Sequence, residues 1–231
     1  MRFAVKTASS AAESTLPNQD AMKSQPTIYV VDDDPTLLGL LPEVQQATGL
    51  AVKRCSSAEE LLDEFRQQSP TGCVLLELRL PGISGTELQK ELLDRGQRIP
   101  LIFVTGSATV STAVEAMKHG AHDFLEKPIA DERLVSSVES ALAADARRRA
   151  EELRQQQATE RMERLSANEM EVLRRILAGM TNKKIASDLD ISLRTVQFRR
   201  AAMMRKLEVQ SKAELIALAL ACGVPPEAEA P

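Results

Sequence analysis

Five short segments with the character of buried strands, each followed by a helical pattern, constrain what this chain can fold into. They span residues 28–31, 50–54, 73–78, 100–105 and 123–126. The first is continuously apolar, which is typical of a parallel strand covered on both faces. Helix-start signals such as Asp34-Pro35 and Ser57 follow the strands. This alternation predicts an open, doubly wound parallel sheet whose ligands bind at the carboxyl ends of the strands.

The part of the sequence that follows these five segments predicts helices only. The composition of residues 139–164 predicts one continuous helix that leaves the first domain. We interpret this helix as a solvated linker, because it has too few apolar heptad positions for a dimerising coiled coil. Four short helices follow, at residues 167–177, 183–189, 193–207 and 211–222. The short turn between the second and third is typical of a helix-turn-helix.

Charge divides the chain in the same way. Residues 27–145 carry 10 basic and 19 acidic side chains, whereas residues 164–223 carry 11 basic and 6 acidic ones. The basic half favours nucleic acid as a partner. We expect an α/β domain at 27–142, a helical linker at 143–163, an all-α domain at 164–224, and disordered tails at 1–26 and 225–231.

Composition argues against several other classes of protein. Three separated cysteines, Cys55, Cys73 and Cys222, form neither a disulfide framework nor a CxxC pair. Two histidines are too few for a zinc or haem site. No apolar run approaches about 18 residues, and no secretory signal is visible. We expect a cytoplasmic protein with no membrane partner and no organic cofactor.

Polar side chains gather at the predicted strand ends. They are Asp32, Asp33 and Asp34 after the first strand, Glu77 near the end of the third, Thr105 at the end of the fourth and Lys127 after the fifth. Because the carboxyl ends of parallel strands meet at one edge, we expect these groups to lie together. Carboxylates beside a hydroxyl and an ammonium suit Mg²⁺-assisted phosphoryl transfer. The alternative, helix caps and surface charges, would be favoured for any one of these residues alone.

The third helix of the basic half has one polar and basic face. At about 100° per residue, Val196, Met203 and Leu207 face inward. The outward face then holds Arg194, Gln197, Phe198, Ala201 and Arg205. A helix fits the major groove of DNA, where such side chains contact base edges. The alternative is an ordinary basic, solvated helix.

Further candidate DNA contacts flank that face. Thr195 and Arg200 lie on the same helix. Asn182, Lys183 and Lys184 begin the preceding helix, where amide groups and lysine can hold a phosphate.

Four segments of the first half carry a family resemblance: VVDDD at 30–34, LRLPGISG at 78–85, VTG at 104–106 and DFLEKP at 123–128. Residues 27–142 resemble the receiver domain of two-component response regulators. The resemblance implies the strand order 2-1-3-4-5, and it usually brings a cis bond before Pro128. It also implies a phosphoryl site and switch at Thr105, Lys127 and Phe124, and a Mg²⁺ site at Asp32, Asp33, Glu77 and Arg79.

Glu77 departs from the receiver pattern, because the family carries its phosphoacceptor aspartate at this position. The extra methylene displaces the carboxylate by about 1 Å, enough to cost about 10²-fold in a positioned reaction. Glu77 should also carry its charge towards Thr105 and Lys127. Three interpretations follow, in order of preference. Glu77 mimics an aspartyl phosphate, leaves an inert dimerisation or docking module, or still accepts phosphate weakly.

The second half resembles the LuxR/FixJ-type helix-turn-helix domain over residues 160–223. The matching segments are 165–173, 179–186, 191–196 and 205–207. The resemblance implies a four-helix domain that binds double-stranded DNA as a homodimer. The family commonly has histidine or tyrosine at Arg199 and a small aliphatic residue at Phe198, so no target sequence can be transferred.

Together the two resemblances predict a FixJ-like transcriptional regulator rather than an enzyme. In that family, activated receivers pair through a face that here holds Met117, His119, Phe124 and Arg133. A sensor histidine kinase and RNA polymerase are the expected further partners. The alternatives are a protein-interaction adaptor that docks on a kinase, a conventional phosphorylation-switched regulator, and a phosphate sink, which Glu77 argues against.

Overall fold

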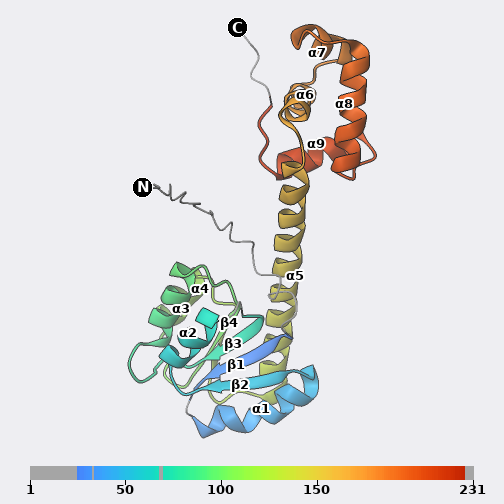
Figure 1. Cartoon of the computed structure of the whole chain (residues 1–231). Helices are drawn as coiled ribbons and strands as arrows, with labels where there is room; N and C mark the ends of the chain where they lie inside the picture. The colour runs from blue at the N-terminus through green and yellow to red at the C-terminus, as the bar shows by residue number, and fades with distance from the viewer. Residues whose placement is uncertain (1–24, 33, 68–69, 227–231) are drawn as a thin grey trace, which may run out of the picture. The chain divides into compact units, whose positions relative to one another are not determined.

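The computed structural model describes residues 25–32, 34–67 and 70–226 (Figure 1). The chain divides into two compact units, Met1–Ala146 and Arg147–Pro231, which we describe separately. Residues 1–24 and 227–231, to which most of the predicted tails belong, lie outside the described residues.

The first unit contains a five-stranded parallel sheet of order β2-β1-β3-β4-β5, which confirms the predicted order. Its strands are β1 (Thr27–Val31), β2 (Ala51–Cys55), β3 (Gly72–Leu76), β4 (Leu101–Thr105) and β5 (Asp123–Glu126). The predicted third strand was too long. β3 ends at Leu76, which places Glu77 directly after the strand.

This unit also contains four helices and the first part of a fifth: α1 (Pro35–Thr48), α2 (Ala58–Gln67), α3 (Gly85–Asp94), α4 (Val110–Lys118) and α5 (Asp131–Glu163). Helices α1 and α5 pack on one face of the sheet, where Leu37 and Leu134 meet Val30. Helices α2, α3 and α4 cover the other face, where Leu61 and Leu88 meet residues such as Val31. Successive residues of β1 thus serve opposite faces, as the doubly wound prediction requires.

Helix α5 runs without a break through residues predicted as the last receiver helix and the linker. Asp145, which is buried, accepts a hydrogen bond of 3.0 Å from the backbone amide of Gly72 at the start of β3. Gly72 has a φ of +116°, and a Cβ there would lie 2.0 Å from the carbonyl oxygen of Thr27. The close approach therefore requires glycine.

The second unit contains the end of α5 and four short helices: α6 (Ala167–Leu177), α7 (Asn182–Asp188), α8 (Leu193–Lys206) and α9 (Lys212–Ala221). Each begins at a hydroxyl N-cap that accepts a hydrogen bond from the third residue of its helix: Ser166, Thr181, Ser192 and Ser211. Their shared core includes Leu173, Ile185, Val196 and Leu215. The predicted four-helix arrangement is confirmed. Within the described part of the chain, no helix is long and apolar enough to cross a membrane.

Candidate acidic site and nucleic-acid interface

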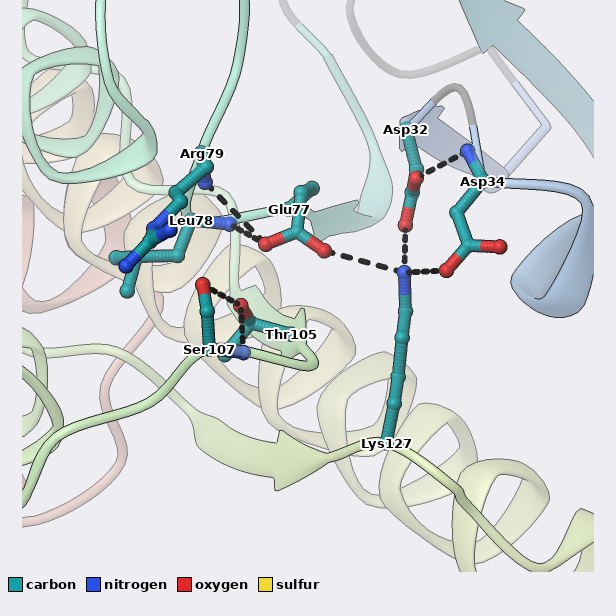
Figure 2. A network of polar contacts seen from close by, with 8 residues as sticks. All are labelled: Asp32, Asp34, Glu77, Leu78, Arg79, Thr105, Ser107 and Lys127. Atoms are coloured by element: carbon teal, nitrogen blue, oxygen red, sulfur yellow. Dashed lines mark hydrogen bonds and ion pairs between the residues drawn. The ribbon is translucent and has the colours of Figure 1, made fainter.

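Four charged side chains meet at the carboxyl edge of the sheet (Figure 2). The ammonium nitrogen Nζ of Lys127, directly after β5, lies 2.8 Å from Oδ2 of Asp32 and 2.8 Å from Oδ2 of Asp34. It also donates to Oε2 of Glu77 at 3.1 Å. The side chains of Asp32, Glu77 and Lys127 are at most 11% exposed. Three carboxylates thus surround one cation in a largely buried setting.

Burial and charge shape the proton affinities of this cluster. Burial raises the pKa of the Asp32 carboxyl, and the hydrogen bond from Lys127 offsets only part of that rise. Burial opposes the charged form of Lys127, but its bonds to Asp32, Asp34 and Glu77 outweigh this and raise its pKa above the ordinary value. Lys127 is therefore a cation throughout the neutral range.

Glu77 is held from both sides. Its Oε1 accepts hydrogen bonds from the backbone amides of Leu78 at 2.7 Å and Arg79 at 3.2 Å, while Oε2 faces Lys127. A Cβ on Gly85, at the start of α3, would lie 2.5 Å from the Glu77 carbonyl oxygen, so only glycine allows this approach. The loop after β3 thus approaches the Glu77 backbone closely at Gly85, while its first two amides bond the Glu77 carboxylate.

The structure brings Glu77 to Lys127 as expected, and the hydrogen bonds described for the Thr105 side chain are with Ser107. The hydroxyl of Thr105 accepts from the backbone amide of Ser107 at 3.3 Å and lies 3.5 Å from the Ser107 hydroxyl. Because Glu77 follows the strand, its carboxylate accepts hydrogen bonds from the amides of its own loop.

The predicted metal ligands are only partly brought together. Asp33 lies outside the described residues. Asp32 and Glu77 face each other across the ammonium of Lys127, and Arg79 donates its backbone amide to Glu77. Among the described residues, no three acidic, histidine or cysteine side chains are grouped so that they could hold a metal ion. The carboxylates are nevertheless the oxygen donors that Mg²⁺ accepts.

The predicted pairing face is partly engaged within the unit. Arg133 donates from Nη2 to both carboxylate oxygens of Asp123, at 3.2 and 2.9 Å. Phe124 is half-buried and stacks on Phe103, with ring centroids 5.8 Å apart. His119 caps the end of α4, and Met117 is 46% exposed. Met117 and His119 are therefore open to a partner, whereas Arg133 already has an ionic one.

The second unit presents the outward face predicted for its third helix. Val196 and Met203 of α8, and Leu207 at its end, are buried. The opposite face is exposed throughout and consists of Arg194, Gln197, Phe198, Ala201 and Arg205. Thr195 bonds to the N-cap Ser192 and so belongs to the start of the helix.

Two residues predicted to contact DNA separately are joined to each other. Nη1 of Arg200 on α8 donates to Oδ1 of Asn182, the first residue of α7, at 2.6 Å. Both residues are half-buried, so this bond fixes one helix against the other. Lys183 and Lys184, next along α7, remain exposed.

The sequence patterns missed the ion pair between α6 and α8. Nζ of Lys206 lies 2.6 Å from Oε2 of Glu169, a buried residue of α6. The pattern Ser166-x-x-Glu169 identifies Glu169 as a capping residue, and its carboxylate does bond the amide of Ser166. That pattern carries no information on a partner 37 positions away.

Both units match known families. Residues 28–139 match the model described as the response regulator receiver domain. Residues 163–219 match the model of bacterial regulatory proteins of the luxR family.

Several known proteins match along most of the chain. The transcriptional regulatory protein FixJ of Azorhizobium caulinodans is 40% identical over 203 residues, covering 88% of this chain and 96% of that protein. The response regulator protein TodT of Pseudomonas putida is 38% identical over 189 residues, covering 82% and 83%. The solved structure of response regulator StyR matches with a TM-score of 0.76 and 35% identity, covering 85% of this chain and 99% of that one.

Proposed function

Because the chain belongs to the FixJ-like response regulators, which join a receiver domain to a luxR-family DNA-binding domain, we propose that it regulates transcription through a receiver that does not depend on phosphorylation. One observation carries this proposal. The Glu77 carboxylate already binds Lys127 at 3.1 Å and two backbone amides. The Glu77 carboxylate thus gives Lys127 a negatively charged partner without phosphorylation, although a phosphoryl group would bring more charge.

The DNA-binding part of the proposal rests on the exposed face of α8. Arg194, Gln197 and Arg205 would contact the major groove, while Lys183 and Lys184 would hold phosphates. We propose double-stranded DNA bound by a homodimer, with RNA polymerase and a sensor kinase as further partners in the cytoplasm. Mg²⁺ bound by Asp32 and Glu77 is part of the same proposal, as is the division into domains at 27–142 and 164–224.

The test compares Glu77 with two replacements in the full-length protein. DNA fragments bound by wild type, Glu77→Asp and Glu77→Ala are selected from a random library, each with and without acetyl phosphate and Mg²⁺. Wild type should select a palindromic site under both conditions. Glu77→Ala should bind that site at least about tenfold more weakly, and Glu77→Asp should need the phosphoryl donor.

A matched control and two contradicting outcomes complete the design. Glu43→Ala removes an exposed carboxylate of the same unit and should leave binding unchanged. Equal binding by wild type and both Glu77 variants would refute the phosphate mimic. So would a stable phosphoryl adduct on Glu77 in mass spectrometry, which would restore the conventional switch.

A second candidate function is a protein-interaction adaptor. An exposed apolar patch on α4 favours it, because Val110, Val114 and Met117 are 84%, 46% and 46% exposed. An adaptor with incidental DNA affinity would bind all sequences alike, with a strong dependence on salt. A regulator instead protects a defined palindromic footprint.

A further inference from the structure

Phe198 is the most exposed large apolar side chain among the described residues of the second unit. It is 68% exposed, on the face of α8 that otherwise holds Arg194, Gln197, Ala201 and Arg205. The inward packing of α8 is supplied by other residues, Val196 and Met203, which are fully buried. Phe198 therefore takes no part in the core of the folded chain.

The residues around Phe198 on the helix leave its ring accessible. One turn later the chain has Ala201 and Ala202, which carry only a methyl group. One turn earlier stands Arg194, which is itself exposed. A large ring beside two methyl groups projects beyond these two alanines, so it meets any surface against which this face of α8 is laid.

The chemistry of the major groove supplies a partner for such a ring. The grooves of DNA are lined by polar base edges, except that thymine presents its 5-methyl group in the major groove. Gln197, the adjacent residue, has the side chain that pairs with adenine, whose partner base is thymine. The two neighbours thus favour the same kind of base pair.

On the basis of the proposed DNA binding, we propose that Phe198 is a specificity-determining residue that packs on the 5-methyl group of a thymine in each half-site. The contact adds an apolar contribution to the polar ones of Arg194 and Gln197. It selects thymine over cytosine, because cytosine lacks the methyl group.

The experiment removes one methyl group at a time. From the site selected by the full-length protein, each thymine is replaced by uracil, which pairs identically but lacks the 5-methyl group. Affinities are measured for wild type, Phe198→Ala and Phe198→Leu. At one thymine position per half-site, uracil should weaken binding by wild type about fourfold, the loss expected for one buried methyl group. Phe198→Ala should bind thymine and uracil equally there, and Phe198→Leu should retain part of the difference.

The matched control is Val110→Ala, which trims another exposed apolar side chain in the first unit. It should keep the full uracil effect. The inference is overturned if no position responds to uracil, or if Phe198→Ala keeps the wild-type loss. A protein that selects no preferred sequence contradicts the proposed DNA-binding function itself, so the two failures are distinguishable. Because Phe198 is exposed, its replacement is not expected to unfold the domain.

Discussion

Lys127 is the residue whose removal tests the acidic cluster most directly. Without its ammonium, Asp32 and Glu77 would remain as buried carboxylates with no cation between them. Breaking such a pair by removing one partner typically costs about 3–5 kcal/mol. Lys127→Met should therefore lower the free energy of unfolding by about that amount at pH 7, measured by urea denaturation of the full chain.

The loss of stability caused by Lys127→Met should also depend on pH. The pKa of Lys127 is raised in the folded protein, so its stabilising contribution is complete below the unfolded value of about 10.4. The difference in the free energy of unfolding between wild type and Lys127→Met should stay constant from neutral pH to about pH 10 and shrink above it. The control Lys90→Met, at an exposed position of α3, should change stability by less than about 0.5 kcal/mol. Equal effects of the two variants would contradict the prediction.

At the scale of elements, the ion pair of Glu169 with Lys206 joins α6 to α8. Burial opposes the charged form of Glu169, but bonds from Lys206 and Ser166 outweigh it and lower its pKa. Glu169→Gln keeps an acceptor for the cap but loses the charge, which should cost about 1–2 kcal/mol at pH 7. The contribution of a carboxyl with lowered pKa is complete above the unfolded value of about 4.3 and is lost as the pH falls from there through the lower pKa of the folded state.

Urea denaturation followed by circular dichroism at pH 7 and pH 3 measures this loss, and amide hydrogen exchange assigns it to α6. Glu171→Gln, on the same helix but exposed, is the matched control and should have little effect at either pH. A Glu169→Gln deficit that is equally large at pH 3 would show that shape rather than charge holds the two helices together.

Elements were more predictable from the sequence than the contacts between them. Local signals such as Ser166 and Ser192 mark where helices begin, and those starts agree with the structure. The hydrogen bond from Arg200 to Asn182 joins residues 18 positions apart, and the local sequence around either residue does not indicate the other as its partner. The orientation of Glu77 likewise depends on where β3 ends, and the apolar pattern placed that end at residue 78 instead of Leu76.

At the scale of the whole molecule, charge is segregated along the chain. Residues 27–145 have a net charge of −9 and residues 164–223 one of +5. DNA affinity falls with salt in proportion to the number of phosphates neutralised, with a slope of about −0.9 per phosphate for double-stranded DNA. Because the acidic unit has a net charge that repels DNA, we expect the salt dependence to come from the second unit.

Single lysine replacements separate local contact from overall charge. Lys183→Ala and Lys118→Ala change the net charge of the molecule by the same amount, but Lys183 lies in the first turn of α7 and Lys118 ends α4. Because each protomer of the homodimer loses one phosphate contact, Lys183→Ala should make the slope of log affinity against log salt shallower by about 1.8 and weaken binding alike on all sequences. Lys118→Ala should leave that slope unchanged. If both replacements shift the slope equally, the net charge of the whole chain governs the attraction, and the phosphate contact assigned to α7 is wrong.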